Sequence, residues 1–127
     1  MSAQPTNNRL EYTIVQAKLG KEPMTNLVRE LVSSTLSVPS AQEVTADGAG
    51  FLPLFFDKNG VGMLAAFTDK SRVTLLGDKV RYCIEMKGID LLRRIPKEYG
   101  LVLNPGGTDV GIDIAPAGIA SIVRDFG

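Results

Sequence analysis

The sequence contains no histidine and only one cysteine, Cys83. Histidine is the side chain that most often moves protons near neutral pH, and it is the usual nitrogen ligand of zinc, copper and iron. Its absence narrows the kinds of enzyme and metal site that the chain can form. A single cysteine cannot form a disulfide within the chain or a multi-cysteine metal site. We therefore expect no metal or other cofactor, and a location in the reducing cytoplasm.

The chain also has no net charge, because its 14 lysines and arginines are balanced by 14 aspartates and glutamates. The basic residues are scattered, and only Arg93 and Arg94 are adjacent to each other. Proteins that bind nucleic acid concentrate such residues where they displace counterions from phosphates. No apolar run approaches the roughly 20 residues of a membrane span, and residues 1–8 lack the pattern of a signal peptide. We expect neither nucleic acid nor a membrane as a partner.

Length and composition indicate one ordinary globular domain. The chain has 127 residues, of which 44% are hydrophobic and 22% are charged. A chain of this length buries about two thirds of the surface that it exposes when unfolded. We expect residues 1–127 to form a single domain, in which residues 1–7 are a flexible tail.

Two amphipathic helices are predicted near the amino terminus. Asn8 and Glu11 have the spacing of a capping box, which predicts a helix over residues 9–19. Pro23 suits the first position of a second helix. Its apolar residues recur at the spacing of one helical face: Met24, Leu27, Val28 and Leu31.

Three further segments have the character of strands. Residues 35–38 form a short β-branched run that Pro39 closes, which favours a sheet edge because proline cannot donate to a ladder. Residues 80–86 alternate between apolar and polar side chains, which predicts a strand with Cys83 on its wetter face. Residues 101–103 are a third apolar run.

A hairpin is predicted where two apolar runs, residues 51–57 and 61–68, flank Asn59-Gly60. Asn-Gly favours a tight hairpin turn because both residues tolerate positive φ. Both strands are apolar almost throughout, which predicts that they are buried on both faces and lie centrally in the sheet. The runs include Phe55, Phe56, Met63 and Phe67, and we interpret these as core side chains rather than as the lining of a pocket.

A second hairpin is predicted to join residues 101–103 to residues 110–114 through the turn Asn104-Pro105-Gly106-Gly107. Helices are predicted for residues 89–95, and from Pro116 to the end of the chain. The last helix carries a stripe of Ile119, Ile122, Val123 and Phe126. A further short helix is predicted to carry Val73 and Leu76.

These elements follow one another in the order ααβ-ββ-α-β-α-ββ-α. The order predicts an α+β (mixed α/β) fold in which helices cover a largely antiparallel central sheet.

Several segments, in this order, resemble the SseB-like N-terminal domain. They are Asn8-Arg9-Leu10-Glu11, Val38-Pro39, Phe51-Leu52-Pro53-Leu54-Phe55, Ala66-Phe67-Thr68-Asp69 and Gly100-Leu101-Val102-Leu103-Asn104-Pro105-Gly106. The chain departs from the family pattern in lacking tryptophan and in reading Asp69-Lys70-Ser71-Arg72 where members often have a glycine-rich finish to the fourth strand. The resemblance implies a stand-alone, divergent member of a family of bacterial proteins. It implies a fold and no chemistry.

The turn at Asn104, Pro105, Gly106, Gly107, Thr108 and Asp109 is the first candidate site. Converging backbone amides in such a turn can cradle a phosphate. A strand is predicted to follow it, however, where a phosphate site needs the start of a helix. We therefore interpret these residues as a hairpin turn that can also serve as a recognition surface.

Three acid or thiol groups are weaker candidates. Asp109 and Asp113 share one side of the predicted strand, but nothing beside them completes an acid–base or metal site, so solvated strand edges are the preferred interpretation. Cys83 lacks a histidine to activate it and is expected to be an inert, semi-buried thiol.

A mixed charged patch near Tyr99 is the second candidate surface. Tyrosine and arginine are typical anchors of protein interfaces, and the alternative is a solvated helix end. The patch consists of Arg93, Arg94, Lys97, Glu98 and Tyr99.

Taken together, the residues favour a non-catalytic protein-binding module over an enzyme. A concrete version is an immunity or adaptor protein in a bacterial secretion or toxin system, with an unidentified protein partner. The alternative is a small-molecule sensor or weak enzyme that uses the cleft beside residues 104–109. A homo-oligomer is compatible with either hypothesis.

Overall fold

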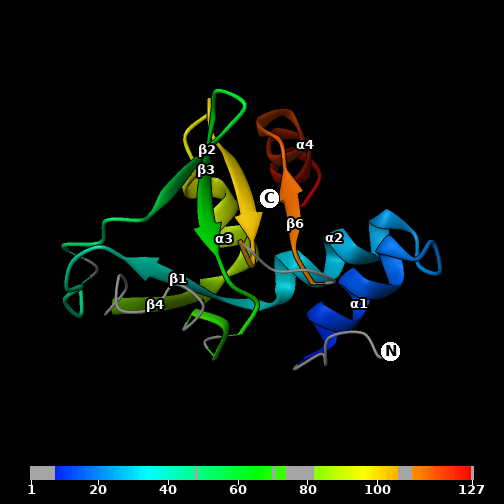
Figure 1. The fold of residues 1–127 in the computed structure, drawn as a ribbon, viewed down its shortest axis with the longest axis horizontal. Coiled ribbons are helices and arrows are strands. Elements are labelled where there is room, and N and C mark those ends of the chain that lie inside the picture. The colour runs from blue at the N-terminus through cyan, green and yellow to red at the C-terminus, as the bar shows by residue number, and fades with distance from the viewer. Residues whose placement is uncertain (1–7, 48, 70, 74–81, 106–109, 127) are drawn as a thin grey trace.

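The structure, a computed structural model, describes residues 8–47, 49–69, 71–73, 82–105 and 110–126 (Figure 1). Its elements are α1 (Arg9–Lys18), α2 (Met24–Ser33), β1 (Thr35–Ser40), β2 (Phe55–Lys58), β3 (Val61–Ala66), β4 (Tyr82–Lys87), α3 (Gly88–Arg94), β5 (Gly100–Leu103), β6 (Ile112–Ile114) and α4 (Pro116–Phe126). The predicted tail, residues 1–7, lies outside the described residues, as does Leu76 of the predicted short helix. None of the helices in the described ranges is long and apolar enough to cross a lipid bilayer.

The strands form two sheets rather than one. β1 and β4 make an antiparallel pair, and the other four strands are ordered β2-β3-β5-β6. Within this larger sheet β2–β3 and β5–β6 are antiparallel, whereas β3 and β5 are parallel, with Leu64 opposite Leu101. The crossover from β3 to β5 contains β4 and α3, and such a long connection is what a parallel pair requires. The predicted mixed α+β class is confirmed, with mainly antiparallel pairing.

β1 joins the two sheets. Ser37 and Phe67 exchange backbone hydrogen bonds of 2.8 Å in both directions, so β1 continues beside the end of β3. The prediction that Pro39 ends this strand is wrong, because Pro39 lies within β1 opposite Cys83. Beyond its pairing with β4, β1 makes the isolated bridges Ser37–Phe67 and Ser40–Pro53, and Pro39 lies between them, where a residue without an amide hydrogen is accommodated.

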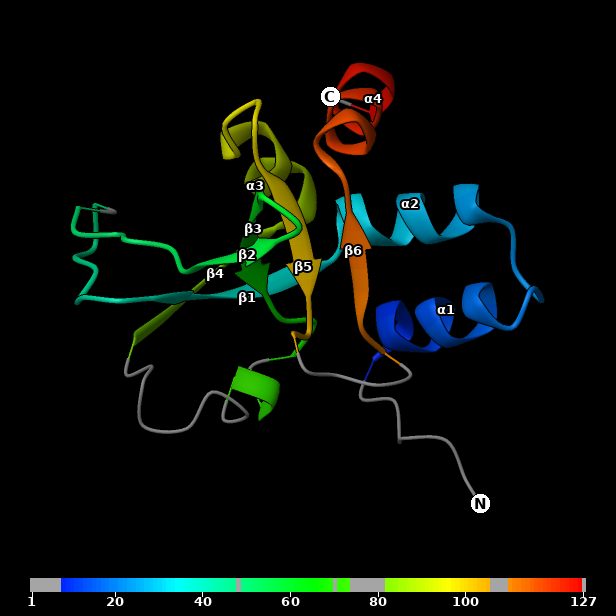
Figure 2. The same ribbon diagram turned by 45° about the horizontal axis from the view of Figure 1, so that its top comes forward.

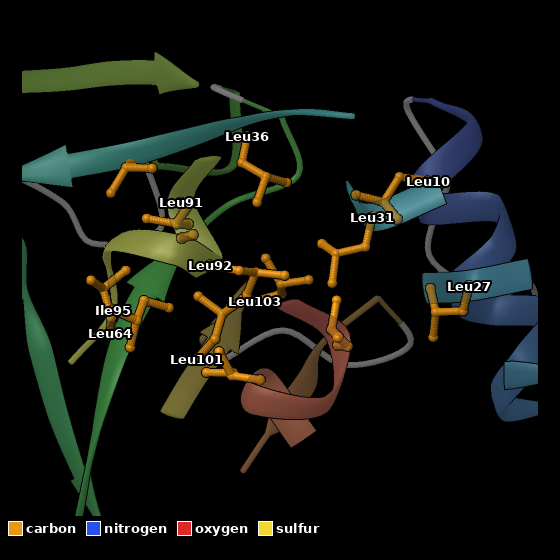
Figure 3. Close-up of a cluster of buried hydrophobic side chains, with 14 of the residues drawn as sticks. Leu10, Leu27, Leu31, Leu36, Leu64, Leu91, Leu92, Ile95, Leu101 and Leu103 are labelled. Carbon is orange, nitrogen blue, oxygen red and sulfur yellow. The ribbon is translucent and has the colours of Figure 1, made fainter. Parts of the chain in front are cut away.

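The hydrophobic core fills the space between the larger sheet and the helices. Figures 1 and 2 show α1 and α2 beyond β6, with α3 beside β3 and β5. Leucines of α3 and β5 converge in this space (Figure 3). Fully burying each such side chain contributes roughly 1.5–3 kcal/mol. The core includes Leu10, Ile14, Leu27, Leu31, Leu64, Leu91, Leu92, Leu101, Leu103, Ile119 and Ile122.

The predicted turn of the first hairpin is confirmed, but the predicted burial of both of its strands is wrong for β2. Asn59 and Gly60 have φ values of 54° and 86°, as the Asn-Gly turn requires. β3 is buried over most of its length, but β2 is exposed throughout, including Phe55 and Phe56. β2 is the outer strand of its sheet, so an apolar run that resembled a central strand lies at an edge.

Four more side chains are more exposed than the sequence predicts. Met24, Tyr82 and Phe126 are exposed instead of contributing to the core, and Cys83 is exposed rather than semi-buried. Met24 is the first residue of α2, at the end of the helix away from the core. Tyr82 and Cys83 belong to the small sheet, where β4 has a single partner strand. Phe126 is the last residue of α4, beyond the part of the helix that packs on the core.

The contact between α2 and α3 depends on Gly88. A β-carbon at this position would lie 1.9 Å from the carbonyl oxygen of Leu31 and 2.9 Å from its carbonyl carbon. The substitution Gly88→Ala forces these backbones apart, and we expect it to lower the free energy of unfolding by at least about 2 kcal/mol. Urea unfolding followed by circular dichroism measures the change.

Gly118→Ala is the matched control because Gly118 also lies in a helix, α4. Its β-carbon would meet only a methyl group of Ile114, at 3.1 Å. That side chain can adjust, and alanine favours helix over glycine by about 1 kcal/mol, so the expected change is within about 1 kcal/mol. Equal stabilities of the two variants would contradict the close contact at Gly88.

Candidate functional site

Asn104, the first predicted site residue, lies at the end of β5 with a φ of 55° and is 1% exposed. Its side-chain oxygen accepts a hydrogen bond from the backbone amide of Thr68 at 3.1 Å. Its amide nitrogen donates to the carbonyl oxygen of Val110 at 2.8 Å and to the Thr68 hydroxyl at 3.0 Å. Asn104 therefore ties the chain after β3 to both ends of the turn between β5 and β6.

The hydrogen bonds of Asn104 continue to a buried ion pair that sequence reasoning missed. Glu11 of α1 is fully buried, and Thr68 donates its hydroxyl proton to the Glu11 carboxylate at 2.5 Å. Arg72 donates to both oxygens of that carboxylate, from Nε and from Nη2, each at 2.7 Å. This bidentate geometry is among the strongest that an arginine and a carboxylate form.

The ion pair fixes the charge of Arg72. The hydrogen bonds that Arg72 donates to Glu11 raise the pKa of the Arg72 guanidinium, and this effect outweighs burial, which acts in the opposite direction. Arg72 is 8% exposed, so its charge is almost wholly enclosed by protein. We call Glu11, Thr68, Arg72 and Asn104 the buried polar network.

The amino terminus of α1 is part of the same arrangement. Asn8 caps the helix by accepting from the Glu11 amide at 2.9 Å, so this half of the predicted capping box is confirmed. The Glu11 carboxylate, however, turns inward to Arg72. Asn8 also donates from its side chain to the carbonyl oxygen of Thr68 at 2.7 Å, a second link between α1 and the end of β3.

The buried polar network holds the base of the candidate turn. Asn104 and Val110 bracket it, and Pro105 is the part of the turn whose position is described. Gly106, Gly107, Thr108 and Asp109 lie outside the described residues. Within the described ranges, every buried polar side-chain atom has a hydrogen-bond partner. The network thus satisfies its own polar groups and serves to anchor the turn.

A cleft of about 450 Å³ lies beside Asn104 and Pro105. The strand register places Phe56, Met63 and Val102 on one face of the larger sheet, opposite the face that carries the leucine core. These three side chains line the cleft. We call this the open-face cleft.

Charged groups surround the open-face cleft, and each has a partner. Lys58 of β2 forms an ion pair with Asp113 of β6, and Lys18 donates to the carbonyl oxygen of Gly111 at 2.6 Å. The predicted partner of Asp113, Asp109, lies outside the described residues. In the part of the chain that the structure describes, no three acidic or thiol side chains gather as metal ligands.

The second predicted surface lies elsewhere in the fold. Tyr99 packs against Phe55, with ring centroids 4.8 Å apart, and covers Gly62. Arg93 and Tyr99 line a separate groove between α3 and α4, while Arg94 is exposed outside its lining. The two predicted surfaces therefore lie apart in the fold.

The ion pair of the buried polar network leads to a stability prediction. Glu11→Gln removes the charge that faces the buried Arg72 guanidinium and leaves only the weaker attraction of Asp69, and we expect a loss of about 3–5 kcal/mol in the free energy of unfolding. Glu30→Gln is the matched control, because Glu30 pairs with Arg9 at the surface. There the expected loss is at most about 1 kcal/mol. Similar losses in urea titrations of the two variants would contradict the role given to Glu11.

Asn104 and Asn59 provide a second comparison, since both have positive φ. Asn104→Gly keeps the backbone conformation but leaves the Thr68 amide and the Val110 carbonyl without their partner, at a cost of at least about 2 kcal/mol. Asn59→Gly removes no buried hydrogen bond, and its expected effect is within about 0.5 kcal/mol. Thermal unfolding of both variants measures the difference. If Asn104→Gly were as stable as the unsubstituted chain, the backbone conformation alone would explain why asparagine occupies this position.

The comparisons with known proteins give one finding. A search of curated proteins and a search of solved structures found no match. A family model described as the SseB protein N-terminal domain matches residues 10–121. This range runs from α1 into α4 and includes every residue of the buried polar network. The chain belongs to the SseB N-terminal domain family.

Proposed function

We propose that the chain is a non-catalytic protein-binding module that binds its partner through the open-face cleft and the anchored turn beside it. The observation that carries the proposal is the pairing of an apolar, partly exposed sheet face with a turn whose base is held by buried hydrogen bonds. Residues that the fold already holds in place, such as Asn104 beside the cleft, lose little conformational freedom when they meet a partner. Phe56, 40% exposed on the edge strand β2, is the aromatic anchor.

Non-catalytic action is supported by how the polar groups near the cleft are used. A catalytic acid, base or nucleophile must have an atom free to meet the substrate. Asn104 is committed to Thr68 and Val110, and Asp113 to Lys58. These groups already have partners within the fold, which favours recognition by shape and by contact with the exposed Phe56.

A specific form of this function is an immunity or adaptor protein of a bacterial secretion or toxin system, acting in the cytoplasm. Its support is the small size and zero net charge of the chain, together with the surface just described. Such a protein works by covering a partner's surface, for which an exposed aromatic side chain and an adjoining turn suffice.

A small-molecule sensor or weak enzyme is the second candidate for the same cleft. Its volume of about 450 Å³ falls within the range of roughly 300–1,000 Å³ typical of ligand pockets. Lys18, Lys58 and Asp113 give it polar groups at the rim of an apolar floor. A polar metabolite with an apolar portion suits this lining.

Photo-crosslinking separates binding at the cleft from binding elsewhere. A benzoylphenylalanine placed at Phe56 is expected to capture a defined protein in the source cell. The same group placed at Phe126, which is equally exposed on α4, is the control and is expected to capture none of it. Phe56→Ser is expected to abolish co-purification of that protein, whereas Phe126→Ser leaves it unchanged. Co-purification that survives Phe56→Ser would contradict the proposed surface.

Thermal unfolding with a metabolite and nucleotide panel tests the second candidate. A ligand at 100 times its dissociation constant stabilises the folded state by about 2.7 kcal/mol, which is a clear shift in midpoint for a chain of this size. Under the protein-binding hypothesis we expect no shift. A shift that disappears in Lys58→Ala would favour the sensor.

A further inference from the structure

The groove between α3 and α4 is a second surface, distinct from the open-face cleft. Its volume is about 630 Å³, and it shares no lining residue with the cleft. Its floor is aliphatic, formed by Leu92 and Ile95 from one side and by Ile119 and Val123 from α4. The floor side chains also pack in the core, so the groove is part of the folded structure.

Small side chains keep the groove open along α4. Ala117 and Ala120 are exposed and line it, three residues apart on the same helical face. Longer side chains at these positions would fill the space between the two helices. A helix that presents alanines beside a floor of isoleucine and valine leaves room for side chains from another molecule.

The charged residues of the groove are all of one sign. Arg93, Lys97 and Arg124 line it, and no acidic residue does. This is notable in a chain with as many acids as bases. The nearest described ion pairs, Asp90–Arg93 at 3.9 Å and Asp125–Arg124 at 3.3 Å, are exposed to water and contribute little. The three cations are exposed, so they meet a partner at the rim and not on the floor.

We propose that this groove binds an acidic amphipathic helix of a protein partner. The apolar face of that helix lies against Ile95, Ile119 and Val123, and its carboxylates face Arg93, Lys97 and Arg124. A helix suits the site because the groove runs between two helices, and apolar side chains at i, i+3 or i+4, and i+7 fill such a groove. A small anion suits it less, because the cations stand at an exposed rim over an aliphatic floor.

A designed peptide tests this surface without knowledge of the natural partner. The probe is a fluorescein-labelled helix of about 16 residues, long enough to be helical, with leucines on one face and glutamates beside them. The comparison peptide has lysine in place of every glutamate. In fluorescence anisotropy with the full chain, we expect the acidic peptide to bind at least roughly tenfold more tightly, and less tightly as salt is added.

Two kinds of variant test whether the peptide binds in this groove: one reverses the charges at its rim, and the other fills it with a large side chain. The double variant Lys97→Glu and Arg124→Glu is expected to reverse the preference between the two peptides, whereas Arg29→Glu on α2 leaves it unchanged. Ala120→Trp is expected to weaken the acidic peptide at least roughly tenfold by occupying the groove. Thr25→Trp, at another exposed helix position, is its control. Circular dichroism confirms that each variant is folded.

Three results would overturn the proposal. They are equal affinity for the two peptides, an unchanged preference in the double charge variant, and full affinity in Ala120→Trp. Loss of peptide binding in Phe56→Ser would also overturn it, because that result places the peptide on the open-face cleft. Since the two surfaces share no lining residue, a negative result for the groove does not count against the proposed function of the cleft, and a negative result for the cleft does not count against the groove.

Discussion

A fully buried carboxylate facing a buried guanidinium constrains this fold more than any other polar contact described above. Glu11 and Arg72 are charged groups removed from water, and each is tolerated because the other lies 2.7 Å away in a bidentate arrangement. Buried ion pairs of this kind add little stability compared with apolar side chains of the same size. They do penalise every arrangement in which the two groups are apart. Here the penalty ties the first helix to the segment that follows β3.

That constraint reaches the candidate turn through one hydroxyl group. Thr68 has a single proton, which it donates to Glu11, so its oxygen is left to accept from Asn104. The direction of this chain of hydrogen bonds orients the Asn104 amide, whose nitrogen then reaches Val110. The positions of Asn104 and Val110, which bracket the turn, thus depend on a charge that belongs to a different element.

Local patterns in the sequence predicted most of the elements and few of the contacts between them. The Asn59-Gly60 turn and the middle of the α2 and α4 stripes depend on neighbours within a few residues, and they are confirmed, whereas Met24 and Phe126 at the ends of these stripes are exposed. The exposure of β2 was missed because an apolar run looks the same at an edge as at the centre of a sheet. The parallel pairing of β3 with β5 was missed because adjacent hairpins suggest antiparallel neighbours.

The sequence predicted a candidate site at Asn104 and Pro105, but it did not predict the buried polar network that holds these residues in place. Glu11 lies on the same helical face as Ile14, and a charge on an apolar face signals a buried partner. Nothing local points to Arg72 as that partner, because the two residues meet only through the tertiary fold. Arg93 and Tyr99 were predicted to act together and do share a groove, but that groove is separate from the turn.

The long separation between Glu11 and Asn104 also affects how the domain is completed during synthesis. At about 5–20 residues per second, the ribosome adds the residues between them in roughly 5–20 s. For about the first two thirds of that interval the Glu11 carboxylate lacks Arg72, and until its end α1 lacks the leucines of β5. β5 adds Leu101 and Leu103 to the core and is the strand on which β6 pairs, and Asn104 follows it directly, so the core is completed late in synthesis. A nascent chain stalled before β5 would therefore be exposed to proteases and chaperones along its whole amino-terminal half.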